Sequence, residues 1–453
     1  MGLLAAHLND AGIVVVDNDR ILYCEPGFAL LEDDKLVTGS AAYASARLNP
    51  RRIHNHYWSQ LQTEPLPDRR FHQLSAADLV SSQLEQMWQK VSPHGDRLAV
   101  AVPPYMSNEN LGLFLGIAGE LNIPIVAMVD AAVCATRRQY EHAVPVHIDV
   151  SLHSTVLTKL LQEEQVQVDR SVVIEDNGLL RLYEVWLKVI AEAFVQQSRF
   201  DPLHTAETEQ ALQDSMPEWL AMAERGTTIP LEVAFKGVVH KAEIESLELV
   251  AAAAPIYQSI VSSMRALFKA EETPAIQFSD RAARLPGLAE TLRSRVGGDV
   301  FLLEPGATAR GLVKRCAGEP KPGGIALSRH LPWDQSATTV KPKGAGAAGR
   351  PTHLLFGHNA FSLDGQPLVL GTQVEAGERS FDLLEEMPGV SRRHCAVGAE
   401  NGQAVVSDFS RYGTFLNGHR IDGSAVLQTG DLIRIGTPGF ELRLIAVEDG
   451  HGA

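Results

Sequence analysis

The chain has 453 residues, of which 45% are hydrophobic, so it can form two or three domains with packed cores. Its formal net charge of −15 argues against a nucleic-acid-binding protein, although it leaves room for a local basic patch. Because the N-terminus lacks a basic region before a long apolar run, and no stretch of about 18 apolar residues occurs, we expect neither a signal peptide nor a membrane span.

Strands and helices are predicted to alternate through the first 316 residues, which is typical of an α/β domain. We expect strands at 12–16, 21–23, 97–102, 125–129, 144–150, 154–161, 275–278 and 300–303, and helices at 75–90, 108–121, 131–140, 179–198, 207–224, 241–269 and 287–296.

The next segment, residues 318–350, is rich in Gly, Pro, Lys, Ala and hydroxyl residues and has almost no apolar periodicity. Its composition predicts a flexible linker, most clearly in the run Lys341-Pro-Lys-Gly-Ala-Gly-Ala-Ala-Gly349. The segment carries Ser336, Thr338 and Thr339.

Three polar blocks follow in order near the C-terminus, and each joins a short apolar strand end to a turn. They are residues 389–395, 408–418 and 429–436. The dipeptide Asn417-Gly418 between apolar pairs is a strong hairpin signal. The blocks therefore predict an all-β domain.

This succession of blocks resembles the forkhead-associated (FHA) domain, a β-sandwich that binds phosphothreonine peptides through its loops. The resemblance runs from about Thr352 to Ile445, and we assign residues 351–449 to the domain. A phosphothreonine carries nearly two negative charges and three acceptor oxygens, so its site needs cations and hydroxyl or amide donors. The resemblance implies peptide contacts from Ser391, Arg392, Arg411 and Tyr412, and structural roles for His394, Gly413, Asn417 and Gly418.

One departure from the family pattern affects the phosphate site. The usual Leu-Gly-Arg is Leu370-Gly371-Thr372 here, so the strongest phosphate ligand is absent from its place. Arg379, at the end of the following loop, is the candidate substitute. The alternative is a docking surface that does not require phosphate.

The N-terminal part resembles the actin-like (ribonuclease H-like) ATPase domain of DnaK-type heat-shock chaperones. The likeness is carried by Ala101-Val-Pro-Pro-Tyr-Met106, Val129-Asp-Ala-Ala-Val-Cys-Ala135 and Arg284-Leu-Pro-Gly287, in the right order and spacing. We assign residues 1–317 to this domain. The peptide-binding sandwich and helical lid of those chaperones do not follow it, so the resemblance does not imply chaperone activity.

The phosphate-binding hairpins of this family need glycines, because backbone N–H groups must approach phosphate without an intervening Cβ atom. Here the first hairpin reads His7-Leu-Asn-Asp-Ala11, the second reads Asp149-Val-Ser-Leu-His-Ser154, and Asp280-Arg281 replaces the adenosine-side glycine pair. These changes predict a pseudo-ATPase without a cofactor, in which neither ATP nor magnesium is expected. The vestigial nucleotide site comprises His7, Asn9, Asp149, Asp280 and Arg281.

Together the two resemblances predict a multidomain adaptor that recruits a protein partner, phosphorylated on threonine, through its FHA domain. The actin-like domain would provide a second docking surface. Cys24, Cys134, Cys316 and Cys395 form no CxxC pair, which excludes a disulfide framework or zinc site and favours a cytoplasmic location. The alternatives are a working DnaK-type ATPase or chaperone with divergent phosphate loops, a phosphate-independent FHA module, and a polymer-forming actin relative.

Overall fold

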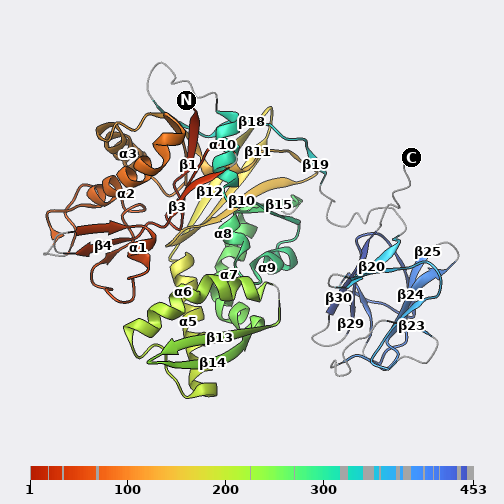
Figure 1. The fold of residues 1–453 in the computed structure, drawn as a ribbon. Coiled ribbons are helices and arrows are strands. Elements are labelled where there is room, and N and C mark those ends of the chain that lie inside the picture. Colours follow the sequence, from red (N-terminus) through yellow and green to blue (C-terminus); the bar gives the residue numbers. More distant parts are fainter. Residues whose placement is uncertain are drawn as a thin grey trace. The chain divides into compact units, whose positions relative to one another are not determined.

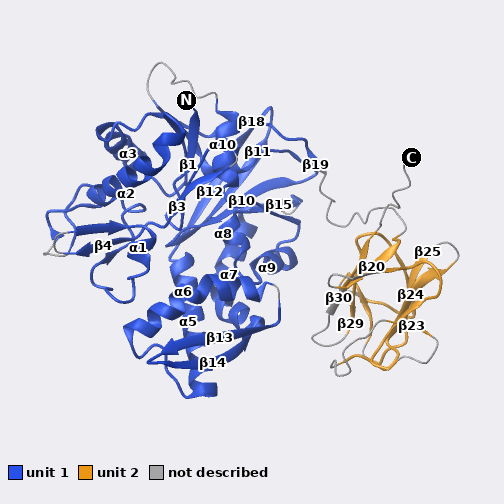
Figure 2. Ribbon diagram, viewed as in Figure 1, with its two compact units in different colours: residues 1–340 blue, residues 341–453 orange. Residues whose placement is uncertain are grey.

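The protein is described by a computed structural model that divides into two compact units, residues 1–340 and 341–453 (Figure 2). We call them unit 1 and unit 2 and describe each by itself. The structure describes residues 2–18, 20–32, 35–67, 71–224, 226–269, 271–316, 325–339, 351–356, 359–373, 378–380, 389–400, 403–411, 413–417, 419–435 and 440–445.

The first large sheet of unit 1 has six strands in the order β17-β8-β7-β1-β2-β3 (Figure 1). Its strands are near-continuous apolar runs, because helices α2 and α3 cover one face and α4 and α10 the other. The strands are β1 (Leu3–His7), β2 (Ile13–Val16), β3 (Ile21–Glu25), β7 (Arg97–Val102), β8 (Ile125–Asp130) and β17 (Leu327–Ser328), and the helices are α2 (Ala76–Val91), α3 (Asn108–Glu120), α4 (Ala131–Ala135) and α10 (Ala307–Arg315).

The second large sheet has the order β16-β15-β10-β11-β12-β18, and five of its strands repeat the topology of the first, whereas the sixth strands β17 and β18 lie at opposite edges. In both sheets three consecutive antiparallel strands are followed by two parallel ones on the far side of the first strand. We call residues 2–130 lobe I and residues 144–302 lobe II. The strands of lobe II are β10 (Val144–Val150), β11 (Ser154–Gln162), β12 (Gln165–Glu175), β15 (Pro274–Phe278) and β16 (Asp299–Leu302), joined by β18 (His330–Pro332).

A hairpin and three long helices form the end of lobe II that is drawn lowest in Figure 1. The prediction of one helix over 241–269 was wrong at its start, because residues 241–245 belong to the second strand of the hairpin. Alternating burial along the first strand places Ile229, Leu231 and Val233 in the core. The elements are α5 (Leu179–Ser198), α6 (Ala206–Ala223), β13 (Thr228–Phe235), β14 (Val238–Glu245) and α7 (Ser246–Leu267).

Helix α7 is the one helix in the described part of the chain that is long and apolar enough to cross a membrane. One such helix is weak evidence for a membrane span, since the core helix of a globular domain has the same composition. Eight of its side chains, from Leu249 to Leu267, are buried in the core of lobe II, which is the environment of a core helix.

The smaller elements of unit 1 connect these parts. Residues 131–140 were expected to be helical throughout, but α4 ends at Ala135 and strand β9 begins at Tyr140. The others are β4 (Ala29–Glu32), β5 (Lys35–Thr38), α1 (Ser40–Tyr43), β6 (Ile53–His54), a 3-10 turn (Ser92–His94), β9 (Tyr140–Glu141), α8 (Asp280–Ala283), α9 (Leu288–Arg295) and β19 (Thr338–Thr339).

The predicted flexible linker at 318–350 was wrong for residues 325–339, which are part of unit 1. Strands β17, β18 and β19 pair with β8, β12 and β9, and Arg137 Nε donates to Asp334 Oδ1 at 3.0 Å. Backbone pairing with distant strands leaves little trace in composition, which explains the error. Residues 317–324 and 340–350 lie outside the described part.

Unit 2 is a sandwich of two antiparallel-rich sheets, which confirms the all-β prediction for the C-terminal region. The sheet orders are β21-β20-β30-β29-β26-β27 and β23-β22-β24-β25-β28, around a core that includes Leu370, Val397, Ile433 and Leu444. The strands are β20 (His353–Phe356), β21 (Asn359–Ser362), β22 (Leu368–Leu370), β23 (Arg379–Ser380), β24 (Cys395–Glu400), β25 (Gln403–Asp408), β26 (Phe415–Leu416), β27 (His419–Arg420), β28 (Ser424–Leu427), β29 (Leu432–Ile435) and β30 (Phe440–Ile445).

Candidate functional sites

Strand pairing in unit 2 brings three loops to one end of the sandwich. Leu370, the last residue of β22, lies opposite Cys395 at the start of β24, and Cys395 lies opposite Asp408 at the end of β25. The loops at 371–373, 389–394 and 409–414 therefore meet at this end. We call this set of loops the Ser391 surface.

Ser391 connects the three loops through hydrogen bonds. Its carbonyl accepts from Thr372 N at 3.2 Å, and its Oγ accepts from Arg411 N at 3.1 Å. The carbonyl of the next residue, Arg392, accepts from Gln373 N at 3.0 Å. Because the Ser391 hydroxyl uses a lone pair for Arg411, its own proton can still be donated to a ligand.

Gly371 is needed for this close approach of the loops. A Cβ atom at this position would lie 2.0 Å from the carbonyl oxygen of Arg392, a distance that backbone atoms cannot accommodate. The glycine in the Leu-Gly-Thr segment therefore sets the spacing of the Ser391 surface, although the usual arginine is absent after it.

His394 is buried beneath the surface and has the geometry expected for a loop-pinning residue. Its Nδ1 accepts from Ser391 N at 3.1 Å, and its Nε2 lies 3.3 Å from the carbonyl of Gly413. Nε2 must therefore carry the proton and donate it, which makes the imidazole neutral. Burial lowers the pKa of His394, in agreement with this neutral form.

A second set of hydrogen bonds shapes the 409–414 loop. Asp408 Oδ1 accepts from Ser410 N at 2.9 Å and from Thr414 Oγ1 at 2.8 Å. Burial would raise the pKa of Asp408, but these hydrogen bonds outweigh it and lower the pKa. Gly413 has a φ of 94°, which a residue with a Cβ atom rarely adopts.

Asn417 occupies the predicted hairpin turn between β26 and β27, with a φ of 50°. Its Nδ2 donates to Asp431 Oδ1 at 2.9 Å, and its Oδ1 accepts from Leu432 N at 3.0 Å. The structural role expected for Asn417 is thus visible as side-chain bonds to the neighbouring strand. Tyr412 and Gly418 lie outside the described residues.

Arg392 and Arg411 are both exposed on the Ser391 surface. Sequence reasoning missed the neighbouring Arg393, whose Nε lies 3.2 Å from Glu378 Oε1 and whose guanidinium stacks 4.1 Å from the ring centre of Phe409. No local motif marks these partners, because they come from separate loops.

Arg379 does not take the place of the missing arginine. It lies on β23 opposite Leu368, at the far end of β22 from Thr372. Its Nη1 donates to the carbonyls of Asp364 at 3.2 Å and Gln366 at 3.5 Å. Parallel pairing with β22 directs Arg379 to the turn before that strand, so in this structure it does not lie where the predicted substitute ligand would be needed.

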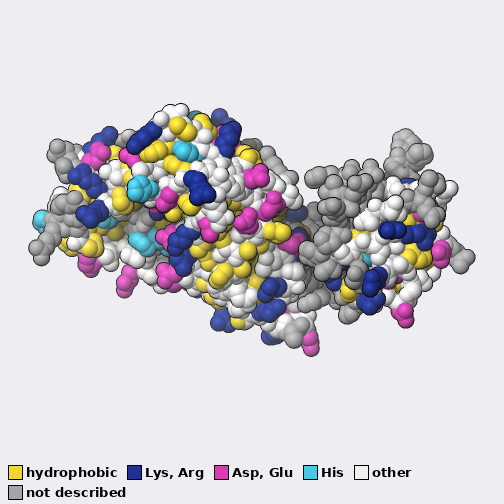
Figure 3. All heavy atoms as spheres, turned by 90° about the horizontal axis from the view of Figure 1, so that it is seen from below, with side chains coloured by type: hydrophobic (Ala, Val, Ile, Leu, Met, Phe, Trp, Pro, Cys, Tyr) yellow, Lys and Arg dark blue, Asp and Glu magenta, His cyan; other side chains and the backbone are white. Residues whose placement is uncertain are grey.

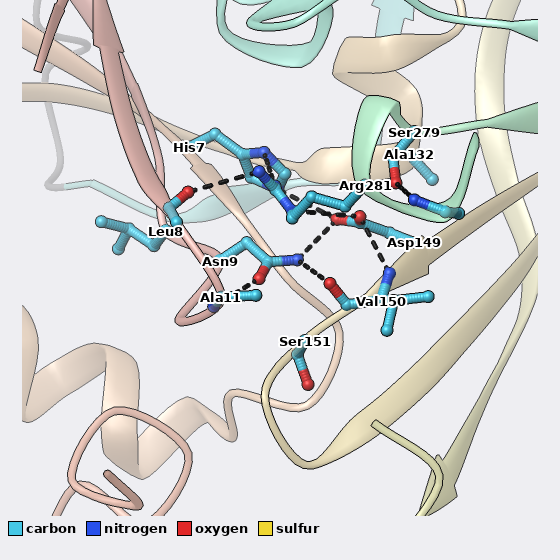
Figure 4. A network of polar contacts seen from close by, with 12 residues as sticks. His7, Leu8, Asn9, Ala11, Ala132, Asp149, Val150, Ser151, Ser279 and Arg281 are labelled. Carbon is cyan, nitrogen blue, oxygen red and sulfur yellow. Dashed lines mark hydrogen bonds and ion pairs between the residues drawn. The ribbon is translucent and has the colours of Figure 1, made fainter. Parts of the chain in front are cut away.

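The second candidate site lies between the two lobes of unit 1, where equivalent turns face each other. The end of β1 contributes His7 and the turn after it Asn9, the end of β10 contributes Asp149, and α8 begins with Asp280 and Arg281. The structure brings all five residues of the predicted vestigial site together, and Figure 4 shows His7, Asn9 and Arg281 directed toward Asp149.

Asp149 is the centre of this network and is almost fully buried. Its Oδ2 accepts from Asn9 Nδ2 at 2.8 Å and lies 3.5 Å from His7 Nε2. Its Oδ1 lies 3.7 Å from Arg281 Nε. Burial alone would raise the pKa of Asp149, but Arg281, together with the nearby His7, His147 and Ser279, outweighs that effect and lowers the pKa to about 2, so the carboxylate is charged.

His7 is neutral and bridges the charged pair. Arg281 Nη2 lies 3.1 Å from His7 Nδ1, and because a guanidinium only donates, Nδ1 is the acceptor and Nε2 carries the proton. The pKa of His7 is lowered to about 3, chiefly by burial and also by the nearby Arg281, against the opposing effect of Asp149. Asp280 lies 3.9 Å from Arg281 Nη1 and 3.6 Å from Arg284 Nη2.

His7, Asn9 and Asp149 of this network are buried, and a small cavity lies beside His7 and Arg281. The cavity that His7, Arg281 and Thr308 help to line has a volume of about 10 Å³, which accommodates one water molecule at most. Small-molecule sites usually measure about 300–1,000 Å³. Within the described residues, no three His, Cys, Asp or Glu side chains are grouped so that they could hold a metal ion.

Sequence reasoning missed Asp10 as a member of the inter-lobe contact. Its Oδ1 accepts from Leu152 N, on the opposite turn, at 2.8 Å. Burial raises the pKa of Asp10 to about 7, against the opposing effect of the Leu152 N–H. The signal that could have found it is the acidic residue directly after Asn9, in the turn that follows β1.

The surface of unit 1 carries both signs of charge. On the face seen in Figure 3, acidic and basic side chains are interspersed. The net charge of −15 is therefore not gathered into one acidic field on this face.

Residues 374–436 match the family model of the FHA domain. Unit 2 therefore contains an FHA domain, a module for protein–protein interaction. No curated protein matches the chain.

Proposed function

We propose that the protein is an adaptor whose FHA domain binds a phosphothreonine-containing partner, and whose unit 1 is an actin-like domain that works without nucleotide. The observation that carries the proposal is that the loop with Ser391 and Arg392 contacts the loop with Arg411 through the hydrogen bond from Arg411 N to Ser391 Oγ. A hydroxyl that can donate its proton, on loops that also carry two exposed arginine side chains, provides the kind of donor set that a phosphate dianion needs.

The repeated topology of lobes I and II supports the actin-like assignment of unit 1. Each lobe has its first strand at the centre of the sheet, and the turns that follow these two strands face each other. Domains of this class bind a ligand between such turns. Here buried side chains occupy that space, which supports a domain that does not hydrolyse ATP.

A reducing compartment is consistent with the cysteines. All four are free thiols, and Cys134 and Cys395 are buried. We place the adaptor in the cytoplasm on this basis, with protein partners and neither a nucleic acid nor a membrane as its binding surface.

Calorimetry with the full chain tests the main claim. A library of threonine peptides is titrated in phosphorylated and unphosphorylated pairs, and we expect at least one pair in which only the phosphorylated member binds. Equal affinity within every pair that binds would identify a docking module that does not require phosphate, which the absence of an arginine at Thr372 favours.

A separate titration tests unit 1. Mg-ATP should leave the thermal unfolding of unit 1 unchanged and should not be hydrolysed. Turnover of ATP that is lost in Asp149→Ala would show a working ATPase instead and would overturn this part of the proposal.

A further inference from the structure

Asp10 of lobe I connects the two lobes, because its side chain accepts a backbone N–H of lobe II. The turn at 151–154 folds on itself through Ser151 N to the Ser154 carbonyl at 2.8 Å. The Leu152 carbonyl accepts from Leu180 N at 3.0 Å, within lobe II. The Leu152 N–H, in contrast, crosses to lobe I and donates to Asp10 Oδ1 at 2.8 Å.

Asp10 itself is held firmly in lobe I. Its side chain is fully buried, and its carbonyl accepts from Gly27 N at 2.7 Å. Its own N–H lies 3.4 Å from the Tyr105 hydroxyl, which donates to the Leu8 carbonyl at 3.2 Å. A Cβ atom on Gly27 would lie 3.1 Å from Asp10 Cβ, so the two backbones are in close contact. The carboxyl group therefore has a fixed position relative to lobe I.

Asn9, the residue before Asp10, makes a parallel connection to lobe II. Its Nδ2 donates to Asp149 Oδ2 at 2.8 Å and to the Val150 carbonyl at 3.1 Å (Figure 4). Its Oδ1 accepts from Ala11 N at 2.9 Å, which fixes the orientation of the amide. Two successive side chains of one turn thus bind the end of β10 and the turn after it.

We propose that Asn9 and Asp10 form an internal latch that holds the two lobes in one closed arrangement without any ligand. A ligand-binding cleft needs polar groups that are free to bind a ligand. Here Asn9 and Asp10 already form hydrogen bonds with the polar groups at the end of β10 and in the turn after it. The latch deepens the proposal that unit 1 works without nucleotide, and rests on it. It makes unit 1 a rigid body with a constant surface, which suits a docking role.

Hydrogen exchange of the full chain, resolved to single amides, tests the latch. In the wild-type chain the Leu152 amide should exchange as slowly as the amides of Val146 and Ile148, which lie in the centre of the sheet. Exchange of Leu152 more than a hundredfold faster than these two would overturn the proposal, and this measurement needs no variant.

Two variants then separate the hydrogen bond from the rest of the site. Asp10→Ala removes the acceptor and should speed Leu152 exchange at least about tenfold, since a buried hydrogen bond is lost. Asp10→Asn keeps an acceptor oxygen and should preserve most of the protection. Asp201→Ala is the matched control, because Asp201 Oδ1 also accepts a backbone N–H, from Leu203 at 3.0 Å, but in an exposed loop within lobe II.

Equal protection of Leu152 in Asp10→Ala and Asp201→Ala would overturn the latch. If Asp10→Ala does not fold, the comparison of Asp10→Asn with wild type decides, and full loss of protection in Asp10→Asn would contradict the hydrogen-bond mechanism. These results are independent of nucleotide. Binding of Mg-ATP by the wild-type chain would refute the nucleotide-free proposal even with the amide protected, so the two failures are distinguishable.

Discussion

Arg281 donates to His7 while lying 3.7 Å from Asp149, so a guanidinium, an imidazole and a carboxylate form one buried cluster between the lobes. In this cluster the Arg281 guanidinium faces the buried Asp149 carboxylate, with Asp280 3.9 Å from its Nη1, and His7 adds no charge because it is neutral. Charges are stable in such a place only when each has its partner. The cluster therefore makes the pairing of Arg281 with Asp149 important for the stability of unit 1.

Arg281→Ala should destabilise unit 1 by about 3–5 kcal/mol, because it leaves Asp149 charged, buried and without its cation. Denaturant unfolding monitored for unit 1 measures the change. Arg284→Ala is the matched control: its side chain is 62% exposed and pairs with Asp280 at the surface, where an ion pair contributes about 1 kcal/mol or less. Equal effects of the two substitutions would contradict a special role for Arg281.

The stability of unit 1 should depend on pH through His7. Its pKa is about 3 in the folded state, below its ordinary value, so the folded state binds fewer protons than the unfolded chain between pH 6.5 and 3. The stability that neutral His7 contributes is complete above pH 6.5 and decreases as the pH falls toward 3. His7→Gln should remove this part of the acid sensitivity.

The measurement is the free energy of unfolding at several pH values between 4 and 8 for wild type and His7→Gln. Asp10 has the opposite dependence, because its pKa is raised to about 7 and its contribution is lost as the pH rises through that value. Taking the difference between the two proteins cancels the Asp10 contribution. A difference that does not change with pH would show that His7 is not buried and neutral.

Gly371→Ala should disrupt the Ser391 surface. The added Cβ atom would lie 2.0 Å from the carbonyl oxygen of Arg392. This oxygen belongs to the backbone, so it cannot move aside as a flexible side chain could. We expect a lower melting temperature of unit 2 and loss of peptide binding, measured by calorimetry on the same sample. Gly112→Ala, in helix α3 with no atom within 4 Å of the new Cβ, is the control that should change neither property. Unchanged peptide affinity in Gly371→Ala would refute the position of the site.

Sequence reasoning succeeded where the signal is local. The apolar runs of β2, β7 and β10 and the turn at Asn417 follow from residue type and spacing, and the structural role of His394 follows from the resemblance of its loop to the FHA domain. It failed where distant segments decide the structure. The pairing of β19 with β9 overrides a linker-like composition, and the pairing of β23 with β22 directs Arg379 away from the Ser391 surface.

The site between the lobes also contains residues that were predicted from the sequence and one residue that was not. The resemblance to actin-like ATPase domains predicted that His7, Asn9, Asp149 and Arg281 are neighbours, because it supplies their relative positions. The bond from Leu152 to Asp10 joins residues 142 positions apart and depends on how the two turns meet. No single-sequence pattern encodes that distance, so the role of Asp10 required the structure.

The arginines of unit 2 provide the most discriminating test of phosphopeptide binding. Arg392→Ala and Arg411→Ala should each weaken a phosphothreonine peptide about tenfold or more, because each removes a charge-assisted contact of roughly 1.5–3 kcal/mol. Arg379→Ala should change the affinity less than about twofold, since its guanidinium binds the carbonyls of Asp364 and Gln366 and solvent screens its charge. Arg443→Ala, exposed on β30 opposite Leu432, controls for a general loss of positive charge.

Calorimetry with a paired unphosphorylated peptide shows whether each loss is specific to phosphate. If Arg379→Ala lowers the peptide affinity as much as Arg392→Ala does, the loop that carries Arg379 rearranges to reach the ligand. If Arg392→Ala, Arg411→Ala and Arg379→Ala all leave the affinity unchanged, the surface docks its partners without phosphate.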